Sequence, residues 1–146
     1  MTNPRSTAAL FGHPLHPMLI AFPVTLYVAT AVVDIIFWFT ANASWASVSQ
    51  WTLGIGVVTA LLAGLAGFID FMGDSRIRSI RIAWWHFLGN VIVTLIEIAN
   101  FSSRYSVAPN WIIPWGMTLS ILAVLLMFGT AWLGGELVFR HRVAVL

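Results

Sequence analysis

Four long apolar runs alternate with short polar segments along the 146-residue chain. The runs cover residues 17–40, 50–72, 82–101 and 111–138, and each is bounded by Pro, Gly, polar or charged residues. A helix of about 20 predominantly apolar residues is long enough to cross the hydrocarbon core of a bilayer. The pattern therefore predicts four transmembrane helices.

The segments between these runs, 41–48, 73–81 and 102–110, are all short. Short connections force neighbouring helices to run antiparallel, which gives an up-down arrangement. The sequence therefore predicts an all-α protein, an integral membrane four-helix bundle that forms a single domain over residues 1–146. An even number of spans places both termini on the same side of the membrane.

Composition agrees with a membrane location. Hydrophobic residues make up 60% of the chain and charged residues 8%, and the mean hydropathy is +0.91. This leaves too little polar surface for a soluble globular protein. The chain has no cysteine, which excludes disulfides, thiolate metal sites and covalent haem attachment. Its net charge of +2 is too small and too scattered to suggest nucleic-acid binding.

The arginines predict the orientation of the bundle. Arg104 alone falls on the side opposite the predicted termini. The other six fall on the side of the termini: Arg5, Arg76, Arg78, Arg81, Arg140 and Arg142. Basic residues are enriched in cytoplasmic loops. We therefore expect both termini in the cytoplasm and the protein in the inner (plasma) membrane. The amino terminus shows no signal-peptide cleavage site, so we expect the first helix to be retained.

All four histidines, His13, His16, His86 and His141, are predicted at this same end of the bundle. Ionisable residues near hydrocarbon are costly and tend to mark functional sites. His13 and His16 are three residues apart at the start of the first helix, a spacing that places both rings on one helical face. Pro23 follows inside the first helix, where its missing N–H donor is expected to kink the axis and leave room for a ligand.

His86 is predicted to lie about 7 Å deeper than Arg81, since it follows that residue by five positions and a helix rises about 1.5 Å per residue. Asn90, Thr94 and Glu97 continue a polar stripe along the same helix. Such a stripe must face protein or water. We expect interhelical hydrogen bonding for Thr94 and a ligand role for His86.

One interpretation of this polar layer is a b-type haem site. Such a site needs axial imidazoles from different helices, an apolar slot and cations near the propionates. His16 with His86 is the preferred axial pair, because their predicted depths are closest, and His13 or His141 is a possible substitute. The cations expected near the propionates are Arg76, Arg78, Arg81 and Arg140.

The alternative is a non-haem ion, Zn, Cu or Fe, because mixed sets of imidazole and carboxylate suit these metals. The candidate ligands are His13, His16, His86, His141, Asp70 and Glu136. Spacing alone does not separate the two interpretations. The arginines and bulky apolar residues at this layer favour haem.

The function we expect is electron transfer by a cytochrome b-like membrane protein, with a lipid-soluble quinone or a redox protein as partner. The competing hypothesis is a non-redox accessory subunit, whose polar layer only fastens the helices, in a larger complex or a homo-oligomer. The sequence has no phosphate-binding loop and no serine nucleophile elbow, so neither a hydrolase nor a transferase is indicated.

Several sequence blocks carry a resemblance to a known family. They are GHPLHP at 12–17 followed by Pro23, GFIDF at 67–71, His86 with Asn90, and GGELVFRH at 134–141. The chain resembles the domain of unknown function 2231 family of small four-helix bacterial membrane proteins, some of which are fused to Rieske iron–sulphur domains. By association, the resemblance implies that the membrane part handles electrons. The chain departs from the family at Glu136, where His is frequent, and at Arg142 and Ala144, where Gly is frequent.

Two further carboxylates, Asp34 and Glu97, are predicted at similar depth in the outer half of the bundle. They could face each other and form part of a proton path. The alternative, which we favour, is that Asp34 is hydrated near the outer interface while Glu97 pairs with Arg104 or is protonated.

Overall fold

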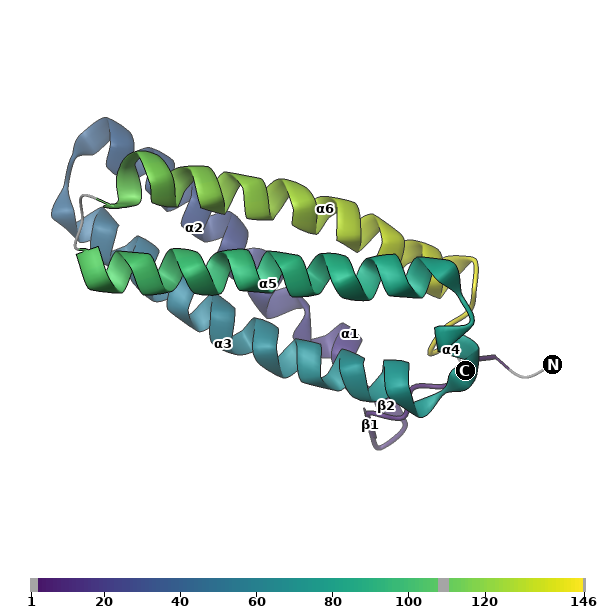
Figure 1. Cartoon of the computed structure of the whole chain (residues 1–146). Helices are drawn as coiled ribbons and strands as arrows, with labels where there is room; N and C mark the ends of the chain where they lie inside the picture. The colour runs from purple at the N-terminus through teal and green to yellow at the C-terminus, as the bar shows by residue number, and fades with distance from the viewer. Residues whose placement is uncertain (1–2, 108–110, 146) are drawn as a thin grey trace.

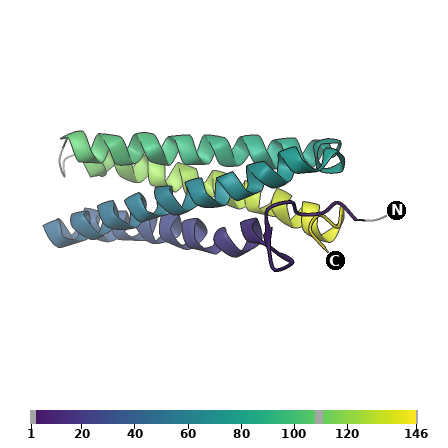
Figure 2. The same cartoon turned by 90° about the horizontal axis from the view of Figure 1, so that it is seen from below.

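Long antiparallel helices form a bundle in the computed structural model of the chain, which describes residues 3–107 and 111–145 (Figure 1). Within these residues, four spans are long and apolar enough to cross a membrane: Leu15–Thr40, Ala43–Gly73, Arg81–Tyr105 and Ile112–Phe139. Both ends of the chain lie at the same end of the bundle, as Figure 2 also shows. The all-α four-helix prediction is confirmed.

Short segments join each element to the next along the chain. The elements are β1 (Ala9–Leu10), β2 (His13–Pro14), α1 (Leu15–Leu19), α2 (Ala21–Thr40), α3 (Ala43–Gly73), α4 (Ser75–Arg78), α5 (Arg81–Val107), η2 (Ile112–Gly116) and α6 (Met117–Phe139). β1 and β2 form a small antiparallel hairpin ahead of the bundle. The first span is divided into α1 and α2 at Ile20. The division lies just before Pro23, which has no N–H to donate to the preceding turn.

Two helices are longer than predicted. α3 begins at Ala43 because Asn42 caps it, with the Asn42 side chain accepting a hydrogen bond from the Ser44 N–H at 2.9 Å. α5 continues to Val107, beyond the predicted end at residue 101. This extension places Arg104 inside a helix and not in a connecting loop.

The packing order places α2 and α5 on opposite sides of the bundle axis. α2 packs against α3 and α6, and α5 packs against the same two helices. α2 and α5 therefore face each other diagonally across the centre, as do α3 and α6. The central core consists of buried residues from all four helices: Tyr27, Leu53, Val57, Ala60, Val93, Ala123 and Met127.

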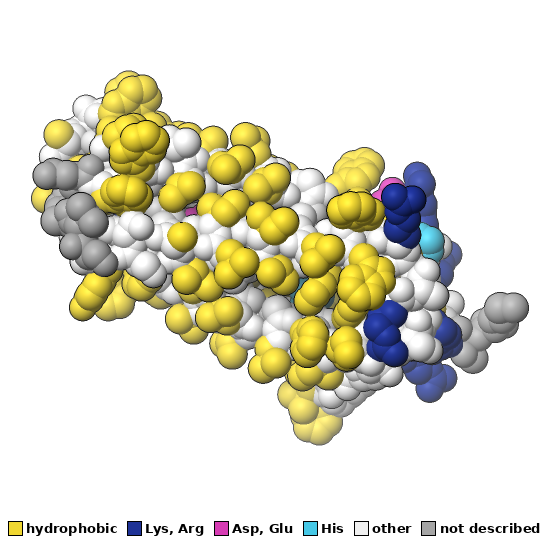
Figure 3. All heavy atoms as spheres, in the orientation of Figure 1, with side chains coloured by type: hydrophobic (Ala, Val, Ile, Leu, Met, Phe, Trp, Pro, Cys, Tyr) yellow, Lys and Arg dark blue, Asp and Glu magenta, His cyan; other side chains and the backbone are white. Residues whose placement is uncertain are grey.

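The surface divides into an apolar region over the helices and a basic end. Hydrophobic side chains cover the middle of the face seen in Figure 3, and arginine side chains gather at the end that carries the termini. We call this the basic end; it carries Arg5, α4 with Arg76 and Arg78, Arg81 at the start of α5, and Arg140 and Arg142 after α6. The opposite end, where α2 joins α3, is called the far end. An apolar belt with a charged end is the surface expected of a protein in a bilayer.

Asp70, near the end of α3, fastens the N-terminal segment to the bundle. Its Oδ1 accepts hydrogen bonds from Ser6 Oγ at 2.8 Å and from the N–H groups of Thr7 and Ala8, both at 2.7 Å. Gly73 permits this approach, since a Cβ there would lie 2.1 Å from Thr7 Oγ1. The hairpin that precedes α1 is thereby held against the basic end.

Replacing Asp70 with Ala is expected to release this segment while leaving the four spans in place. Three hydrogen bonds to one carboxylate disappear together, and bonds to charged groups contribute about 1.5–3 kcal/mol each. Amide hydrogen exchange at Thr7 and Ala8 should accelerate at least about tenfold. Glu136→Ala, which removes a carboxylate elsewhere at the basic end, is the control. Unchanged protection in Asp70→Ala would contradict the anchoring role.

Asp74 caps α4 just beyond the membrane span. Its side chain accepts from the Arg76 N–H at 2.9 Å, from the Arg5 N–H at 3.1 Å and from the Arg76 guanidinium at 2.6 Å. These bonds, chiefly those from Arg76, hold the pKa of the Asp74 carboxyl well below its usual range. The turn between α3 and α5 therefore keeps its ionised cap throughout the neutral pH range.

Candidate functional site

Two of the four histidines meet inside the bundle. His16 lies on α1, and His86 lies on α5 across the axis. Their ring centroids are 6.1 Å apart and their planes are nearly perpendicular, at 85°. Both residues are half-buried. This is the pair that the predicted depths favoured.

The two rings are held by equivalent hydrogen bonds. His16 Nδ1 is 2.8 Å from the carbonyl oxygen of Ala63 on α3, and His86 Nδ1 is 2.8 Å from that of Thr130 on α6. Because a carbonyl only accepts, each Nδ1 must carry the proton. In neutral imidazole this leaves the lone pair on Nε2. Metal-binding histidines are commonly fixed in this way, with the second nitrogen donating to a carbonyl.

A glycine stands behind each ring. Gly67 follows Ala63 by four residues, and Gly134 follows Thr130 by four. A Cβ at Gly67 would lie 2.8 Å from His16 Nδ1, and one at Gly134 would lie 2.9 Å from His86 Cε1. Both distances are shorter than van der Waals contact allows. Glycine is therefore required for each ring to reach its carbonyl.

The other candidate ligands lie away from this pair. His13 is exposed in β2, so the prediction that it shares a helical face with His16 is wrong: the helix begins only at Leu15. His141 is exposed beyond α6, Asp70 holds the N-terminal segment, and Glu136 pairs with the arginine one turn later at 3.1 Å. Over residues 3–107 and 111–145, no group of three or more His, Asp or Glu is arranged to hold a metal ion.

The four arginines proposed as propionate partners all lie at the basic end. Arg76 binds Asp74, Arg78 donates to two backbone carbonyls at the end of α3, and Arg140 pairs with a carboxylate one turn earlier. Arg81 is exposed at the start of α5, one helical turn or more before His86. Its guanidinium meets no acceptor in the described part of the chain.

Aromatic rings from α3 and α5 pack together near the basic end of the bundle. Phe71 stacks on Phe87 with centroids 5.1 Å apart and an angle of 4°, and it meets Trp84 edge-on at 4.7 Å. Phe68 lies 6.0 Å from Phe87. Phe68 and Phe87 directly follow Gly67 and His86 in the sequence, so this aromatic cluster lies at the same level of the bundle as the histidine pair.

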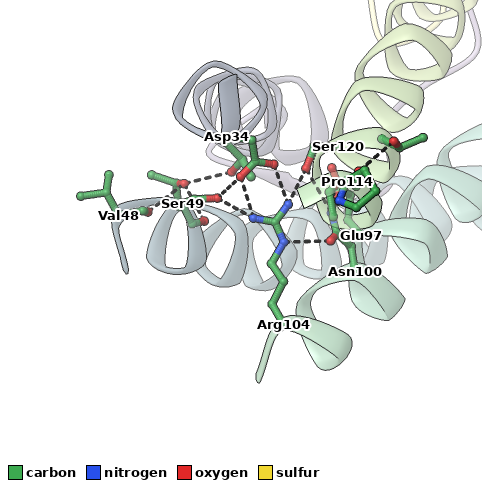
Figure 4. Close-up of polar contacts among 12 residues, drawn as sticks. Asp34, Val48, Ser49, Glu97, Asn100, Arg104, Pro114 and Ser120 are labelled. Atoms are coloured by element: carbon green, nitrogen blue, oxygen red, sulfur yellow. Dashed lines mark hydrogen bonds and ion pairs between the residues drawn. The ribbon is translucent and has the colours of Figure 1, made fainter. Parts of the chain in front are cut away.

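A second polar cluster lies in the far half of the bundle and centres on Arg104 (Figure 4). Its guanidinium forms a two-pronged ion pair with Asp34 of α2, at 2.8 and 2.6 Å, and both side chains are completely buried. Its remaining N–H groups donate to Ser49, Asn100 and Ser120. All five donors of the guanidinium are therefore used.

This arrangement corrects the prediction for the outer half. Asp34 is not hydrated; it has no exposed surface and takes Arg104 as its partner. Glu97 is not paired with Arg104 either: its Oε2 accepts from Asn100 Nδ2 at 3.0 Å. The reason is that both terminal nitrogens of the arginine reach across the axis to Asp34 on α2, while on its own helix Arg104 donates through Nε to Asn100 and not to Glu97 (Figure 4).

The sequence held one signal for this pairing. Eighteen residues separate His16 from Asp34, and eighteen also separate His86 from Arg104. A helix of that length rises about 27 Å. Two helices that meet through their histidines at the basic end are therefore expected to meet again, through Asp34 and Arg104, near the far end.

The whole bundle follows the same repeat. The buried residues Pro23, Tyr27, Thr30 and Asp34 of α2 correspond, 70 residues later, to the buried Val93, Glu97, Asn100 and Arg104 of α5. The buried Ser49, Leu53, Gly56, Ala60 and Ala63 of α3 correspond, 67 residues later, to Gly116, Ser120, Ala123, Met127 and Thr130. The first and second helix pairs are thus two similar halves around an approximate twofold axis along the bundle. The histidine pair and the ion pair both lie across this axis.

Comparison with known families agrees with this architecture. The sequence profile of a family described as a predicted membrane protein, DUF2231, matches residues 12–146. The chain belongs to this family. No curated protein and no solved structure matches it. The DUF2231 match includes both histidines of the pair, both glycines behind them and both members of the buried ion pair.

Two residues after α6 have strained backbone conformations. Arg142 and Ala144 have φ values of 56° and 60°, in the left-handed region. Glycine adopts this region at no steric cost, whereas residues with a Cβ do not. The turn after α6 is therefore formed here by residues less favourable than Gly. The Ala144 N–H donates to Pro4 O at 2.9 Å, which holds the turn against the N-terminal segment.

Proposed function

We propose that this DUF2231 protein binds a b-type haem between His16 and His86 and transfers electrons in the membrane. The observation that supports the proposal is the facing pair of imidazoles on diagonal helices, each with Nδ1 bound to a backbone carbonyl. This leaves Nε2 of each ring, one from each half of the bundle, as the nitrogen that would bind a metal.

The separation of the rings agrees with a shared metal. A metal–imidazole bond is about 2.0–2.1 Å long, so two rings on opposite sides of one ion have centres about 6 Å apart. The observed distance is 6.1 Å. A porphyrin supplies four nitrogens of its own, so two axial imidazoles complete the coordination of the iron.

The number of available ligands favours haem over the Zn, Cu or Fe alternative. Protein sites for non-haem ions generally use three or four protein ligands. The part of the chain that the structure describes brings together two of the proposed ligands. Aromatic side chains lie at the level of His86 along α3 and α5, which suits an apolar macrocycle, and Arg81 is available for a propionate.

The orientation and the partners are part of the proposal. The excess of arginines at the basic end indicates that this end, both termini and the cofactor face the cytoplasm, with the protein in the inner (plasma) membrane. A lipid-soluble quinone or a redox protein is the proposed partner for electron exchange. The apolar belt of the bundle is in keeping with contact with a quinone in the lipid.

One observation favours a second candidate, the non-redox accessory subunit. The bonds from His16 to Ala63 and from His86 to Thr130 each join two helices, so the histidines also act as interhelical ties. In this case the rings would stabilise the bundle without binding any group, and the apolar surface would dock against a larger complex or a second copy.

The absorption spectrum of the purified protein tests these alternatives. Protein expressed with a haem supply and purified in detergent is expected to show a Soret band that shifts on reduction. His16→Ala and His86→Ala should each abolish the low-spin spectrum, because each removes one axial ligand. His13→Ala and His141→Ala are the matched controls and should keep it, since both side chains are exposed away from the pair.

Two results would contradict haem binding. One is a colourless wild-type protein that stays colourless after incubation with haem, and the other is a full spectrum in both variants of the pair. In the first case, metal analysis of the same sample decides between a non-haem ion, in stoichiometric amount, and the accessory role, with none.

A further inference from the structure

Two buried polar groups without partners lie between the histidine pair and the Arg104 cluster. They are the hydroxyl of Tyr27 on α2 and Oε1 of Glu97 on α5. Tyr27 is 2% exposed and Glu97 is not exposed at all. The two residues occupy equivalent positions of the two halves, 70 residues apart, so both lie at the bundle axis. Buried polar atoms without partners are rare and need a specific explanation.

Glu97 has no cation of its own. Arg104, the cation on its helix, uses all five N–H donors on other groups, and its charge is balanced by Asp34. α2 contributes Tyr27 and Asp34 to the surroundings of Glu97, whereas α3 and α6 contribute only serine hydroxyls to this cluster. An ionised Glu97 would thus be an uncompensated charge in the membrane interior, which is costly.

A neutral carboxyl fits these surroundings better. Its Oε2 accepts the Asn100 amide at 3.0 Å, which leaves the proton on Oε1. Oε1 and the Tyr27 hydroxyl form no direct hydrogen bond with each other, since neither has a partner. A single water molecule between them would satisfy both and would carry a proton to or from the carboxyl.

We propose that Glu97 is a reversible proton-binding site inside the membrane, and that it takes up a proton when the group held by His16 and His86 is reduced. The second part rests on the proposed function. His86 and Glu97 are eleven residues apart on one helix, about 16 Å by helical rise. In an interior of low dielectric, charges at that separation still influence each other.

The coupling follows from charge balance. An oxidised cofactor carries one more positive charge than a reduced one and therefore partly offsets an ionised Glu97. One electron from a quinol or a redox protein removes that charge, and the carboxylate then binds one proton from bulk water to become a neutral acid. Re-oxidation returns the electron to an acceptor and the proton to water, so the cycle is balanced.

Infrared difference spectroscopy on the whole protein, reduced and oxidised at an electrode, tests this proposal. Wild-type protein is expected to show a carboxylic acid C=O band that appears on reduction and shifts in D₂O. Glu97→Gln should lose the band, and Tyr27→Phe should shift it. Glu136→Gln changes the other glutamate of the chain, which lies at the basic end. It is the matched control and should retain the band. The midpoint potential of the proposed haem should fall with rising pH in wild-type protein and in Glu136→Gln. In Glu97→Gln the potential should no longer depend on pH.

The failure of this proposal differs from the failure of haem binding. A redox-active Glu97→Gln protein with an unchanged band and an unchanged pH dependence would overturn the role of Glu97. A wild-type protein without any redox group would overturn both the proposed function and the coupling. In that protein, a carboxyl band that titrates with pH and is absent from Glu97→Gln would still support the proton site, and the absence of such a band would overturn it.

Discussion

Replacing Arg104 with Met is expected to cost the bundle about 3–5 kcal/mol of stability, the range seen when one partner of a buried ion pair is removed. Asp34 loses both bonds from the guanidinium and keeps the one from the Ser49 hydroxyl, so its carboxylate stays completely buried without a counter-charge. Thermal unfolding in detergent is the measurement. Arg81→Met, which removes an exposed arginine from the same helix, should change stability by less than about 0.5 kcal/mol.

The approximate symmetry offers a second test of the same pair. Because Asp34 and Arg104 occupy equivalent positions of the two halves, exchanging them in the double variant Asp34→Arg, Arg104→Asp should recover a substantial part of the loss. Each single substitution alone should remain destabilising. An exchange no more stable than the worse single variant would argue against the equivalence of the two positions.

Adding one methyl group at Gly67 or Gly134 is expected to weaken cofactor binding at least about tenfold, the lower range for disturbing the groups that orient a metal-bound histidine. The new Cβ would occupy the space of the His16 or His86 ring. The ring must then give up the hydrogen bond from its Nδ1 to the backbone carbonyl. Its Nε2 consequently moves away from the position in which both histidines could bind one metal. Haem titration of Gly67→Ala and Gly134→Ala measures the effect.

Each helix provides its own control for this experiment. A Cβ at Gly64 on α3 or at Gly129 on α6 would meet nothing within 4 Å. Gly64→Ala and Gly129→Ala should bind the cofactor normally, and helix propensity predicts a gain of up to about 1 kcal/mol in stability. Equal affinities in all four alanine variants would show that the glycines do not position the rings.

The four spans were predictable because hydropathy over about 20 residues is a strong signal. The start of α3 was not, since Ser44, Ser47 and Ser49 gave its first turns the composition of a loop. Their role depends on tertiary structure: Ser49 lies inside the bundle and bonds Asp34 and Arg104. A local pattern cannot show that a serine-rich turn is buried.

The histidine pair was predictable from depth, because His86 lay too far inside the membrane for a headgroup residue. The place of His13 was not predictable from its spacing alone. Phe11 and Gly12 adopt positive φ values of 50° and 80°, which turns the chain into the hairpin and starts the helix only after His13. Arg104 was assigned to the outer loop because the apolar run ends at residue 101. Its distance of eighteen residues from His86 becomes informative only beside the equal distance from His16 to Asp34.

The opposite charges of Asp34 and Arg104 favour pairing of the first half of the bundle with the second half over pairing of two identical halves. Two copies of the first half, brought together in the same way, would set aspartate against aspartate in hydrocarbon, and two copies of the second would set arginine against arginine. Each half is therefore selective for the other, although both have matching buried positions and could otherwise self-associate. A lone half-protein produced in a membrane should consequently recruit its complementary half in preference to itself.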